Sequence, residues 1–308
     1  MNVPTHVHEG KNGYLFLGGG RHSVFDLFTG KTGPSRASRE TFYDNLSRRA
    51  ALCAARGIDF RMVIFPEKCR ALRKHLVMGD EIESVFLRDY ASGDGSDSRI
   101  VYPIDLLDGE DRCFTKTDTH YSSAGFLAIA RRLAETCHPE VADAVGARLE
   151  AGMGDARPYS GDLGRACVPP RSETVPRFHP DPDIVQETNG VESGNDGLLL
   201  IQKNAAALTE KTLLIFGDSF FRLMLPYLAP LYRRIIFCRT RFFHDEILAA
   251  TSPDIVFSGM AERYLSDCRP DGQRDHFLNI PLVLGKRTAP TPGFAALWQE
   301  ATIRAQLI

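Results

Sequence analysis

The stretch between residues 211 and 260 alternates between apolar runs and short amphipathic segments, and it constrains the fold more than any other part of the sequence. It reads as strand, helix, strand, helix and strand, at 212–216, 220–228, 233–238, 244–251 and 253–260. Such an alternation implies parallel strands joined by right-handed crossovers. Reactive groups in sheets of this kind lie beyond the carboxyl ends of the strands. The residues that follow 216 and 260 are therefore the first candidates for a functional site.

The remaining periodic segments extend the same pattern. Residues 38–56 place apolar positions on one face of a helix, Gly57 ends it, and a buried strand at 58–66 follows. Further strands are predicted at 13–17, 100–107 and 197–202, and a further helix from Ser122 or Ser123 to Cys137. Residues from about 150 to 197 are rich in Gly, Pro, Asp and Arg, so we expect a loop-rich insertion there, with room for a small hairpin. The sequence thus predicts an α/β fold with a mainly parallel sheet.

Composition is that of a globular protein and argues against several classes of partner. Of 308 residues, 43% are hydrophobic and 25% are charged, and the net charge is −2. Such a balance favours neither nucleic acid nor an anionic membrane, and no apolar run approaches the roughly 20 residues that cross a bilayer. The amino-terminal residues lack the basic and apolar regions of a secretory signal, so the sequence alone predicts a cytoplasmic protein.

Cysteine and histidine are not spaced for disulfides or for metal binding. The seven cysteines are an odd number and contain no C-x-x-C pair, which argues against a disulfide framework and a structural zinc site. His6 and His8 lie near the terminus without a spaced carboxylate, which is a weak arrangement for a ligand set. We therefore expect no bound metal.

The motif Gly217-Asp218-Ser219 stands between the predicted strand at 212–216 and the helix that follows it. Gly217 permits a tight turn, which would display Ser219 as a nucleophile beyond the end of the strand. Asp and Ser are also the usual residues at a helix N-terminus, where their side chains accept hydrogen bonds from free backbone N–H groups. The motif by itself leaves both roles open.

Asp118 and His120 form a second candidate motif, in a polar turn just before the helix that begins at Ser122 or Ser123. An Asp two residues from a His in a loop can contact the imidazole, fix its tautomer and stabilise the imidazolium. The alternative is an Asx-turn and helix cap made by Asp118, Thr119 and Ser122, with His120 merely exposed.

Together the two motifs supply the parts of a serine-nucleophile enzyme. A serine hydroxyl is a poor nucleophile near neutral pH and needs a base to remove its proton. The reaction also needs N–H donors for the oxyanion, and a helix N-terminus at Ser219 and Phe220 would offer them. Ser219, His120 and Asp118 would then act as nucleophile, general acid/base and orienting carboxylate.

With these motifs the chain resembles the SGNH hydrolase superfamily, although its His and Asp precede the serine by about a hundred residues. That reversed order resembles the alginate O-acetyltransferase branch, the AlgX/AlgJ type, whose SGNH-like domain is circularly permuted. Several stretches agree in order over roughly residues 9 to 265: EGKNGYLFL at 9–17, GIDFRMVIFPEKCRAL at 57–72, DTHY at 118–121, SGDLG at 160–164 and PDIVFSGMAERYL at 253–265. The resemblance implies a three-layer α/β sandwich, formed as a single catalytic domain over residues 1–308.

The resemblance also implies roles for individual residues. It assigns the triad to Asp118, His120 and Ser219. Tyr121 stands where the family usually has Trp, and its ring could stack on a sugar. The rest of the serine motif would contact the substrate or its oxyanion, namely Gly217, Asp218 and Phe220.

Three more residues are candidates on the same ground. Arg263 could stabilise negative charge, or it could be paired with a carboxylate such as Glu262 or Asp267. Asp162 and Lys68 would shape the site, or would be no more than a loop cap and a surface charge.

The resemblance implies an enzyme that moves acetyl groups onto carbohydrate hydroxyls through an acetyl-serine. With water as the acceptor, the same triad would make a carbohydrate acetylesterase, and a member without activity would bind glycan in a polysaccharide synthesis complex. No cofactor is expected to be bound, but an acetyl donor is required, and a membrane acyltransferase could supply it. We expect neither nucleic acid nor direct membrane insertion. The family works in the periplasm, which is the alternative to the cytoplasmic prediction.

Overall fold

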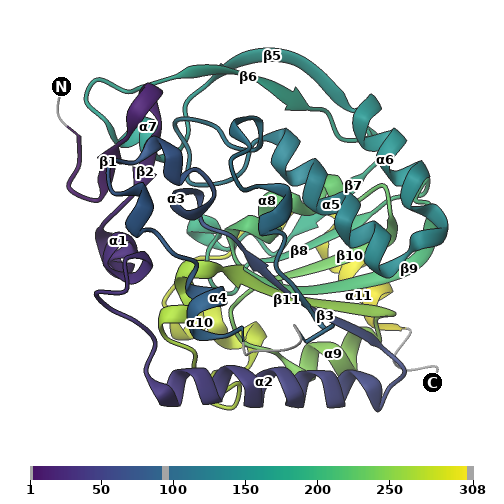
Figure 1. Cartoon of the computed structure of the whole chain (residues 1–308). Coiled ribbons are helices and arrows are strands. Elements are labelled where there is room, and N and C mark those ends of the chain that lie inside the picture. Colours follow the sequence, from purple (N-terminus) through teal and green to yellow (C-terminus); the bar gives the residue numbers. More distant parts are fainter. Residues whose placement is uncertain (1–2, 92–96, 304–308) are drawn as a thin grey trace.

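The computed structural model describes residues 3–91 and 97–303, and at its centre is a seven-stranded sheet with helices on both faces (Figure 1). The strands in spatial order are β4 (Ile100–Val101), β3 (Asp59–Phe65), β11 (Ile255–Ala261), β9 (Thr209–Gly217), β10 (Tyr232–Arg239), β8 (Leu199–Lys203) and β7 (Val185–Thr188). The first five are parallel, whereas β8 runs antiparallel to β10 and β7 runs antiparallel to β8. The expected α/β fold with a mainly parallel sheet is confirmed.

Helices cover the two faces of the sheet and complete the three layers. One face carries α2 (Arg36–Ala54) and α9 (Asp245–Thr251), and the other carries α5 (Ser123–Cys137) and α8 (Ser219–Leu228) (Figure 1). The smaller elements around this core are α1 (Val24–Phe28), α3 (Lys68–Ala71), α4 (Val85–Asp89), α6 (Ala142–Ala151), α10 (Ile280–Val283), α11 (Phe294–Ile303) and a short sheet of β1 (Val7–Glu9) and β2 (Leu15–Leu17).

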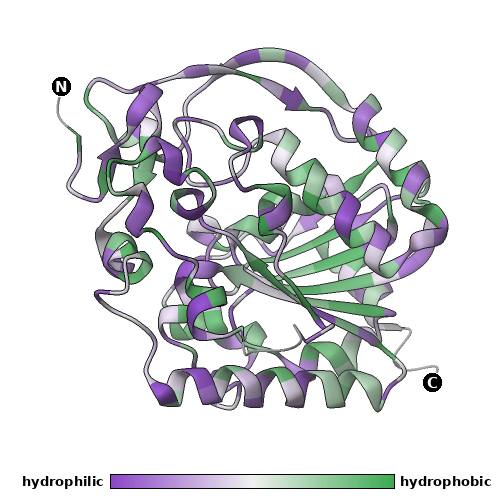
Figure 2. Cartoon of the chain, viewed as in Figure 1, coloured by the Kyte–Doolittle hydropathy of each residue, from purple (hydrophilic) through white to green (hydrophobic). Residues whose placement is uncertain are grey.

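The central strands are apolar over their carboxyl-terminal parts, where helices cover both of their faces (Figure 2). Residues 212–217 of β9 are all buried, as is every residue of β11. α8 packs on this sheet through Phe220 and Phe221, whose ring centroids lie 5.3 and 4.9 Å from that of Phe65 in β3. The start of α8 is therefore held against the carboxyl ends of β3 and β9.

The predicted strand at 100–107 is wrong over most of its length. β4 contains only Ile100 and Val101, and a 3-10 helix at Ile104–Leu106 follows. Pro103 separates the two, because it has no N–H for the strand ladder and its fixed φ suits the start of a helical turn.

Residues 150–197 are more regular than expected. The small hairpin is present as β5 (Met153–Tyr159) paired antiparallel with β6 (Glu173–Phe178), and α7 (Asp162–Ala166) lies between the two strands. The hairpin lies over α5 (Figure 1). β7 belongs to the same stretch, but it joins the main sheet as its last strand.

The carboxy-terminal residues line the outer edge of the sheet beside β7. The N–H of Thr291 donates to the carbonyl of Thr188 at 3.0 Å, and the N–H of Thr188 donates to Oγ1 of Thr291 at 2.9 Å. This segment therefore satisfies backbone groups that β7 would otherwise present to solvent. In the part of the chain that the structure describes, no helix has both the length and the apolar character to cross a bilayer.

Candidate active site

Ser219 is the first residue of α8 and follows the carboxyl end of β9 after one intervening residue. Packing requires Gly217 at the end of the strand, because a Cβ there would meet the Phe221 ring at 2.6 Å. The strand can therefore turn into the helix without a side chain in the way, and Ser219 is left half-buried at the carboxyl edge of the sheet.

Asp218 holds the backbone rather than a substrate. One of its carboxylate oxygens accepts the N–H of Phe220 at 2.9 Å, and the other accepts the N–H of Ala261 at 2.7 Å. The start of α8 is thus tied to the end of β11. The expected substrate contact by Asp218 is wrong because the carboxylate is buried, and the N–H of Phe220 is already bonded and does not face an oxyanion. The N–H of Ser219, at the start of the helix, is left as the backbone donor of this motif.

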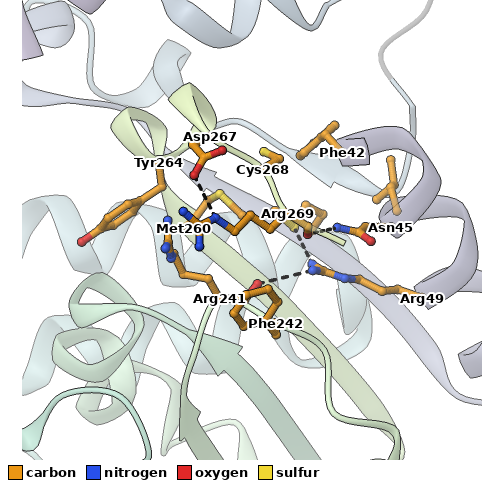
Figure 3. Close-up of a pocket in the computed structure, with 12 residues that line it drawn as sticks. Phe42, Asn45, Arg49, Arg241, Phe242, Met260, Tyr264, Asp267, Cys268 and Arg269 are labelled. Atoms are coloured by element: carbon orange, nitrogen blue, oxygen red, sulfur yellow. Dashed lines mark hydrogen bonds and ion pairs between the residues drawn. The ribbon is translucent and has the colours of Figure 1, made fainter. Parts of the chain in front are cut away.

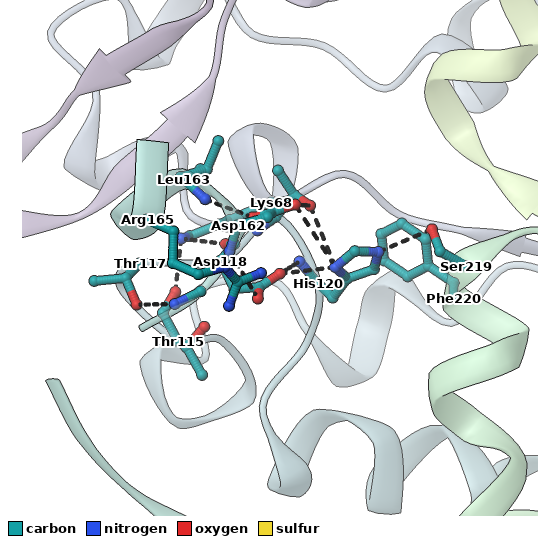
Figure 4. Close-up of polar contacts among 12 residues, drawn as sticks. Lys68, Thr115, Thr117, Asp118, His120, Asp162, Leu163, Arg165, Ser219 and Phe220 are labelled. Carbon is teal, nitrogen blue, oxygen red and sulfur yellow. Dashed lines mark hydrogen bonds and ion pairs between the residues drawn. The ribbon is translucent and has the colours of Figure 1, made fainter. Parts of the chain in front are cut away.

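His120 bridges Ser219 and Asp118 (Figure 4). Its Nε2 lies 2.9 Å from Oγ of Ser219, and its Nδ1 lies 2.7 Å from Oδ1 of Asp118. The loop that carries His120 leads into α5, and α5 packs against α8, so residues 99 positions apart come into contact. The three side chains have the sequence of contacts that a Ser-His-Asp triad requires.

The hydrogen bonds determine which nitrogen of the imidazole carries the proton. Burial opposes the ionisation of Asp118, but hydrogen bonds from His120 and Tyr159 and the imidazole charge outweigh it and hold the pKa of that carboxyl well below its usual range. An ionised carboxylate only accepts hydrogen bonds, so Nδ1 of a neutral imidazole donates to Asp118. Nε2 then accepts the hydrogen of the Ser219 hydroxyl.

Tyr159, which the sequence analysis missed, completes the surroundings of Asp118. It is the last residue of β5, and its hydroxyl donates to Oδ2 of Asp118. Burial, together with the hydrogen bond to Asp118, raises the pKa of the phenol well above its usual value, so the hydroxyl keeps its proton. The only signal in the sequence was its position, one residue before the S-G-D-L-G stretch.

Asp162 lies at the site, where it holds the loop of the D-T-H motif. Its two carboxylate oxygens accept the N–H of Thr119 at 2.8 Å and the hydroxyl of Thr119 at 2.5 Å. Its own N–H donates to Oδ2 of Asp118 at 3.2 Å. Of the two roles considered for Asp162, the contacts match the loop cap.

Lys68 is buried behind the same loop, so its description as a surface charge is wrong. Its ammonium donates to the backbone carbonyls of Leu15, Thr115, Lys116 and Asp118, at 2.8, 2.6, 3.1 and 2.9 Å. Burial lowers the pKa of Lys68 to about 7. Lys68 shapes the site indirectly, because it fixes the backbone that carries Asp118.

Tyr121 does not offer a flat face to a sugar. Only 5% of its surface is exposed, and its hydroxyl donates to the carbonyl of Pro66 at 2.7 Å. Its ring packs among four others, those of Phe65, Phe114, Phe126 and Phe220. Tyr121 contributes to the wall of the cavity beside His120, but the apolar core takes up its ring, so the stacking role implied by the resemblance is wrong for this residue.

Arg263 is paired, but with a different carboxylate from those considered. Its Nη1 lies 2.6 Å from Oε1 of Glu67, and neither Glu262 nor Asp267 is its partner. The guanidinium lies over the ring of Phe220, 5.7 Å from its centroid, and the same ring contacts the imidazole. Arg263 therefore places a positive charge close to the serine motif, and a role in stabilising negative charge stays a prediction.

A cavity of about 190 Å³ lies beside His120, between α5, α8 and the hairpin. Leu223 and Tyr227 line it from α8, one and two turns after Ser219, so the cavity follows the helix face that begins with the serine. In the wall, Thr115 Oγ1 is buried and has no hydrogen-bond partner among the described residues. The other wall residues are mainly apolar or aromatic and include Phe126, Tyr159, Val175, Pro176, Arg177 and Phe178.

A second cavity lies on the α2 side of the sheet and is much smaller (Figure 3). Its volume of about 30 Å³ is enough for roughly two water molecules. Its arginines are already engaged, because Arg49 forms two bonds with Asp271, at 2.7 and 2.8 Å, and Arg241 lies over the Tyr264 ring. This cavity has no room for a sugar.

Three atoms that could bind a metal ion, one each from Asp118, His120 and Asp162, lie within 4.8 Å of one another. Within residues 3–91 and 97–303 this is the one group of three or more potential metal ligands. Asp118 and His120 already bond to each other, and Asp162 bonds to Thr119, so a metal ion would have to replace those contacts. A site without metal stays our expectation.

Comparison with known proteins gives the family. Residues 7–220 match the family described as SGNH hydrolase-like domain, acetyltransferase AlgX. The matched stretch is more than half of the chain and includes Asp118, His120 and Ser219. A comparison with the curated proteins found no match.

Solved structures share the fold at low sequence identity. PatB1 of Bacillus cereus, determined with a sulfonyl adduct, has a TM-score of 0.57 at 13% identity, over 84% of this chain and 97% of PatB1. The O-acetyltransferase domain of Pseudomonas putida AlgJ has a TM-score of 0.51 at 14% identity, over 91% of this chain and 99% of that domain. AlgX of Pseudomonas aeruginosa has a TM-score of 0.52 at 15% identity, over 91% of this chain and 66% of AlgX. The sequence match covers more than half of the chain, and this chain therefore belongs to the family described as SGNH hydrolase-like domain, acetyltransferase AlgX.

Proposed function

We propose that this protein transfers acetyl groups to the hydroxyls of a polysaccharide through an acetyl-serine on Ser219. The continuous contacts from Ser219 through His120 to Asp118 are the observation that supports the serine mechanism most. The family match supports acetyl as the group transferred, and a carbohydrate acceptor is proposed from the resemblance described for the sequence.

In the first half of the reaction, Oγ of Ser219 attacks the carbonyl carbon of the acetyl donor while Nε2 of His120 takes the serine proton. The carbonyl electrons move to oxygen, and Asp118 stabilises the imidazolium that has formed. The oxyanion then collapses, the bond to the leaving group breaks, and the leaving group takes the proton from the imidazolium. Ser219 now carries the acetyl ester.

In the second half, a carbohydrate hydroxyl takes the place of the leaving group. Nε2 of His120 removes its proton, the acceptor oxygen attacks the acetyl carbon, and a second oxyanion forms. Its collapse breaks the bond to Oγ of Ser219, which regains a proton from the imidazolium. The product is an O-acetylated sugar and free enzyme.

Each oxyanion needs donors that are in place before the charge develops. The N–H of Ser219, at the positive end of the α8 dipole, is one candidate. The guanidinium of Arg263, held by Glu67 and by the Phe220 ring, is the other.

The cavity beside His120 is the proposed acceptor site. A hydroxyl bound there reaches the imidazole that must take its proton, and the aromatic wall matches the apolar face of a sugar ring. Transfer prevails over hydrolysis when a bound sugar excludes water from the acetyl-serine. Water as the acceptor would make the protein an acetylesterase, and the products of the assay separate the two.

The source of the acetyl group is proposed from the family resemblance. We propose that the protein binds no cofactor and takes its acetyl group from a separate donor, delivered by a membrane acyltransferase. We also favour the periplasm over the cytoplasm, because the family resemblance implies that compartment. Cell fractionation followed by immunodetection tests the location.

Hydrolysis of 4-nitrophenyl acetate tests the nucleophile. The parent is expected to release 4-nitrophenol and to gain the mass of one acetyl group, located on the peptide that contains Ser219. Loss of a triad member in serine enzymes lowers the rate by about 10^4 to 10^6, so Ser219→Ala should be nearly inactive. Ser47→Ala, on the exposed face of α2, is the matched control and should behave like the parent.

Two outcomes would contradict the proposal. Ser219→Ala that turns over the ester as fast as the parent would show that the serine is not the nucleophile. A parent that binds glycans but neither hydrolyses the ester nor becomes acetylated would favour the non-catalytic alternative.

A further inference from the structure

The second oxygen of Asp118 has donors of its own, which the triad does not use. Oδ1 is engaged by His120, through Nδ1 at 2.7 Å and through its backbone N–H at 2.9 Å. Oδ2 accepts the hydroxyl of Tyr159 and the N–H of Asp162 at 3.2 Å. Asp118 is buried, so no solvent shell competes for these positions. The carboxylate is therefore held at both ends.

Tyr159 belongs to the segment 159–173, which forms several hydrogen bonds with the loop that carries residues 117–120. Two residues after it, the N–H of Gly161 donates to Oγ1 of Thr117 at 3.0 Å, and the N–H of Gly164 donates to the carbonyl of Thr117 at 2.8 Å. At the start of β6, Glu173 accepts the N–H and the hydroxyl of Thr117, both at 2.7 Å. The segment from 159 to 173 thus sets the position of the loop that carries both Asp118 and His120.

The ring of Tyr159 is fixed independently of its hydroxyl. The Arg177 guanidinium of β6 lies over it, 5.8 Å from the centroid. The phenol is thereby aimed at Asp118 before any substrate arrives. A residue held in this way can orient a carboxylate without losing its own freedom at the moment of reaction.

We propose that Tyr159 is a positioning residue for the triad: its hydroxyl fixes the plane of the Asp118 carboxylate, and thereby the direction in which His120 presents Nε2 to Ser219. The inference rests on the proposed function, and it makes the inserted hairpin part of the catalytic machinery. Without the hydroxyl, Oδ2 keeps only the longer contact with Asp162, so the carboxylate can turn about its Cβ–Cγ bond. The imidazole then spends less time aligned with Oγ of Ser219.

Tyr159→Phe tests the inference, because it removes the hydroxyl and keeps the ring between Arg177 and the loop. We expect kcat for 4-nitrophenyl acetate to fall by about tenfold, equivalent to about 1.4 kcal/mol, with KM changed by less than about twofold. Tyr43→Phe is the matched control, because it removes a phenol that donates to the carbonyl of Tyr90 far from the site. Thermal unfolding of both variants shows whether either has lost its fold.

A double-mutant cycle separates positioning from a general packing effect. If Tyr159 acts through Asp118, then adding Tyr159→Phe to Asp118→Asn changes the remaining rate by less than about twofold. Equal effects of Tyr159→Phe in the two backgrounds, or no effect in the parent, would overturn the inference.

A spectroscopic measurement keeps the inference testable even if the protein proves to have no esterase activity. The proton between Nδ1 of His120 and Asp118 is expected to give a signal far downfield in the NMR spectrum of 15N-histidine-labelled protein. Tyr159→Phe is expected to move this signal, and Tyr43→Phe is expected to leave it in place. An unmoved signal in Tyr159→Phe would refute positioning, whereas an inactive parent with a moved signal would refute the proposed function alone.

Discussion

Lys68→Met is the substitution whose effect the structure defines most sharply. The ammonium of Lys68 is enclosed and donates to four backbone carbonyls, three of which belong to residues 115–118 of the loop that carries the D-T-H motif. Methionine has a similar length and shape but no donor. The carbonyl of Lys116 also accepts the N–H of Leu15 at 2.8 Å, so the substitution leaves three buried acceptors unsatisfied, those of Leu15, Thr115 and Asp118, without opening a large cavity.

The expected loss of stability follows from those contacts. An unsatisfied buried carbonyl costs about 1 kcal/mol at the low end, so three of them lower the free energy of unfolding by about 3 kcal/mol. With about 2.1 cal/mol/K of unfolding entropy per residue, a chain of 308 residues has roughly 0.65 kcal/mol/K in total. The thermal midpoint should therefore fall by about 5 °C. Ester hydrolysis should fall as well, because the loop that carries Asp118 loses its anchor.

Thermal unfolding and ester hydrolysis, each measured on the same preparations, test this expectation. Lys203→Met is the control: Lys203 pairs with Glu300 at the half-exposed surface, and its loss should change stability by no more than about 0.5 kcal/mol. If Lys68→Met unfolds within about 1 °C of the parent and keeps full activity, the carbonyls are satisfied in another way and the reasoning is wrong.

Raising the pH gives a second check on Lys68. Burial lowers the pKa of Lys68 to about 7, whereas an unfolded chain holds its lysines near 10.4. Between these values the unfolded chain binds more protons, so the parent gains stability as the pH rises and the methionine variant lacks this gain. The difference between the two should widen from pH 7 towards pH 10, and a constant difference would contradict the assignment.

The cavity wall, the loop cap and a buried histidine each give a further expectation. Leu223→Trp should raise KM for an acceptor glycan about tenfold more than KM for 4-nitrophenyl acetate, because it fills the cavity beside His120; equal changes would exclude the cavity as acceptor site. Asp162→Ala removes both acceptors of Thr119 and should lower kcat for the ester about tenfold, and an unchanged kcat would show that the cap is dispensable. Burial lowers the pKa of His244 to about 4, so only the unfolded chain gains that proton as the pH falls from 6.5 to 4, and stability is lost over this window. In urea titrations His244→Gln should reduce that loss by up to about 3 kcal/mol, and an equal loss in both proteins would rule out His244 as its source.

The parts of the site that depend on strand order were predictable from sequence. The alternation of strands and helices places Ser219 at the carboxyl edge of the sheet, and the helix after Ser122 brings His120 to the same edge. Apolar periodicity carries this information because each strand and helix has to bury one continuous face.

The residues that surround the triad could not be predicted in this way. Tyr121 directly follows the D-T-H motif in sequence, yet its ring belongs to the core, whereas Tyr159 contacts Asp118 across 41 positions. Lys68 binds backbone carbonyls, which every residue has, so no residue type in the sequence marks the positions that it contacts. The contacts that hold the D-T-H loop are tertiary, and neighbouring residues in the sequence do not encode them.

The segment that lines β7 has a consequence for self-association. A sheet ends with unpaired N–H and C=O groups that another chain can extend, and proteins commonly block such edges. Here Thr291 bonds to both the N–H and the carbonyl of Thr188, so the carboxy-terminal segment covers the edge on which a second molecule could add a strand. A chain trimmed before residue 286 would offer that edge to its neighbours, and its characteristic failure would be growth into filaments or precipitate while the serine site stays intact.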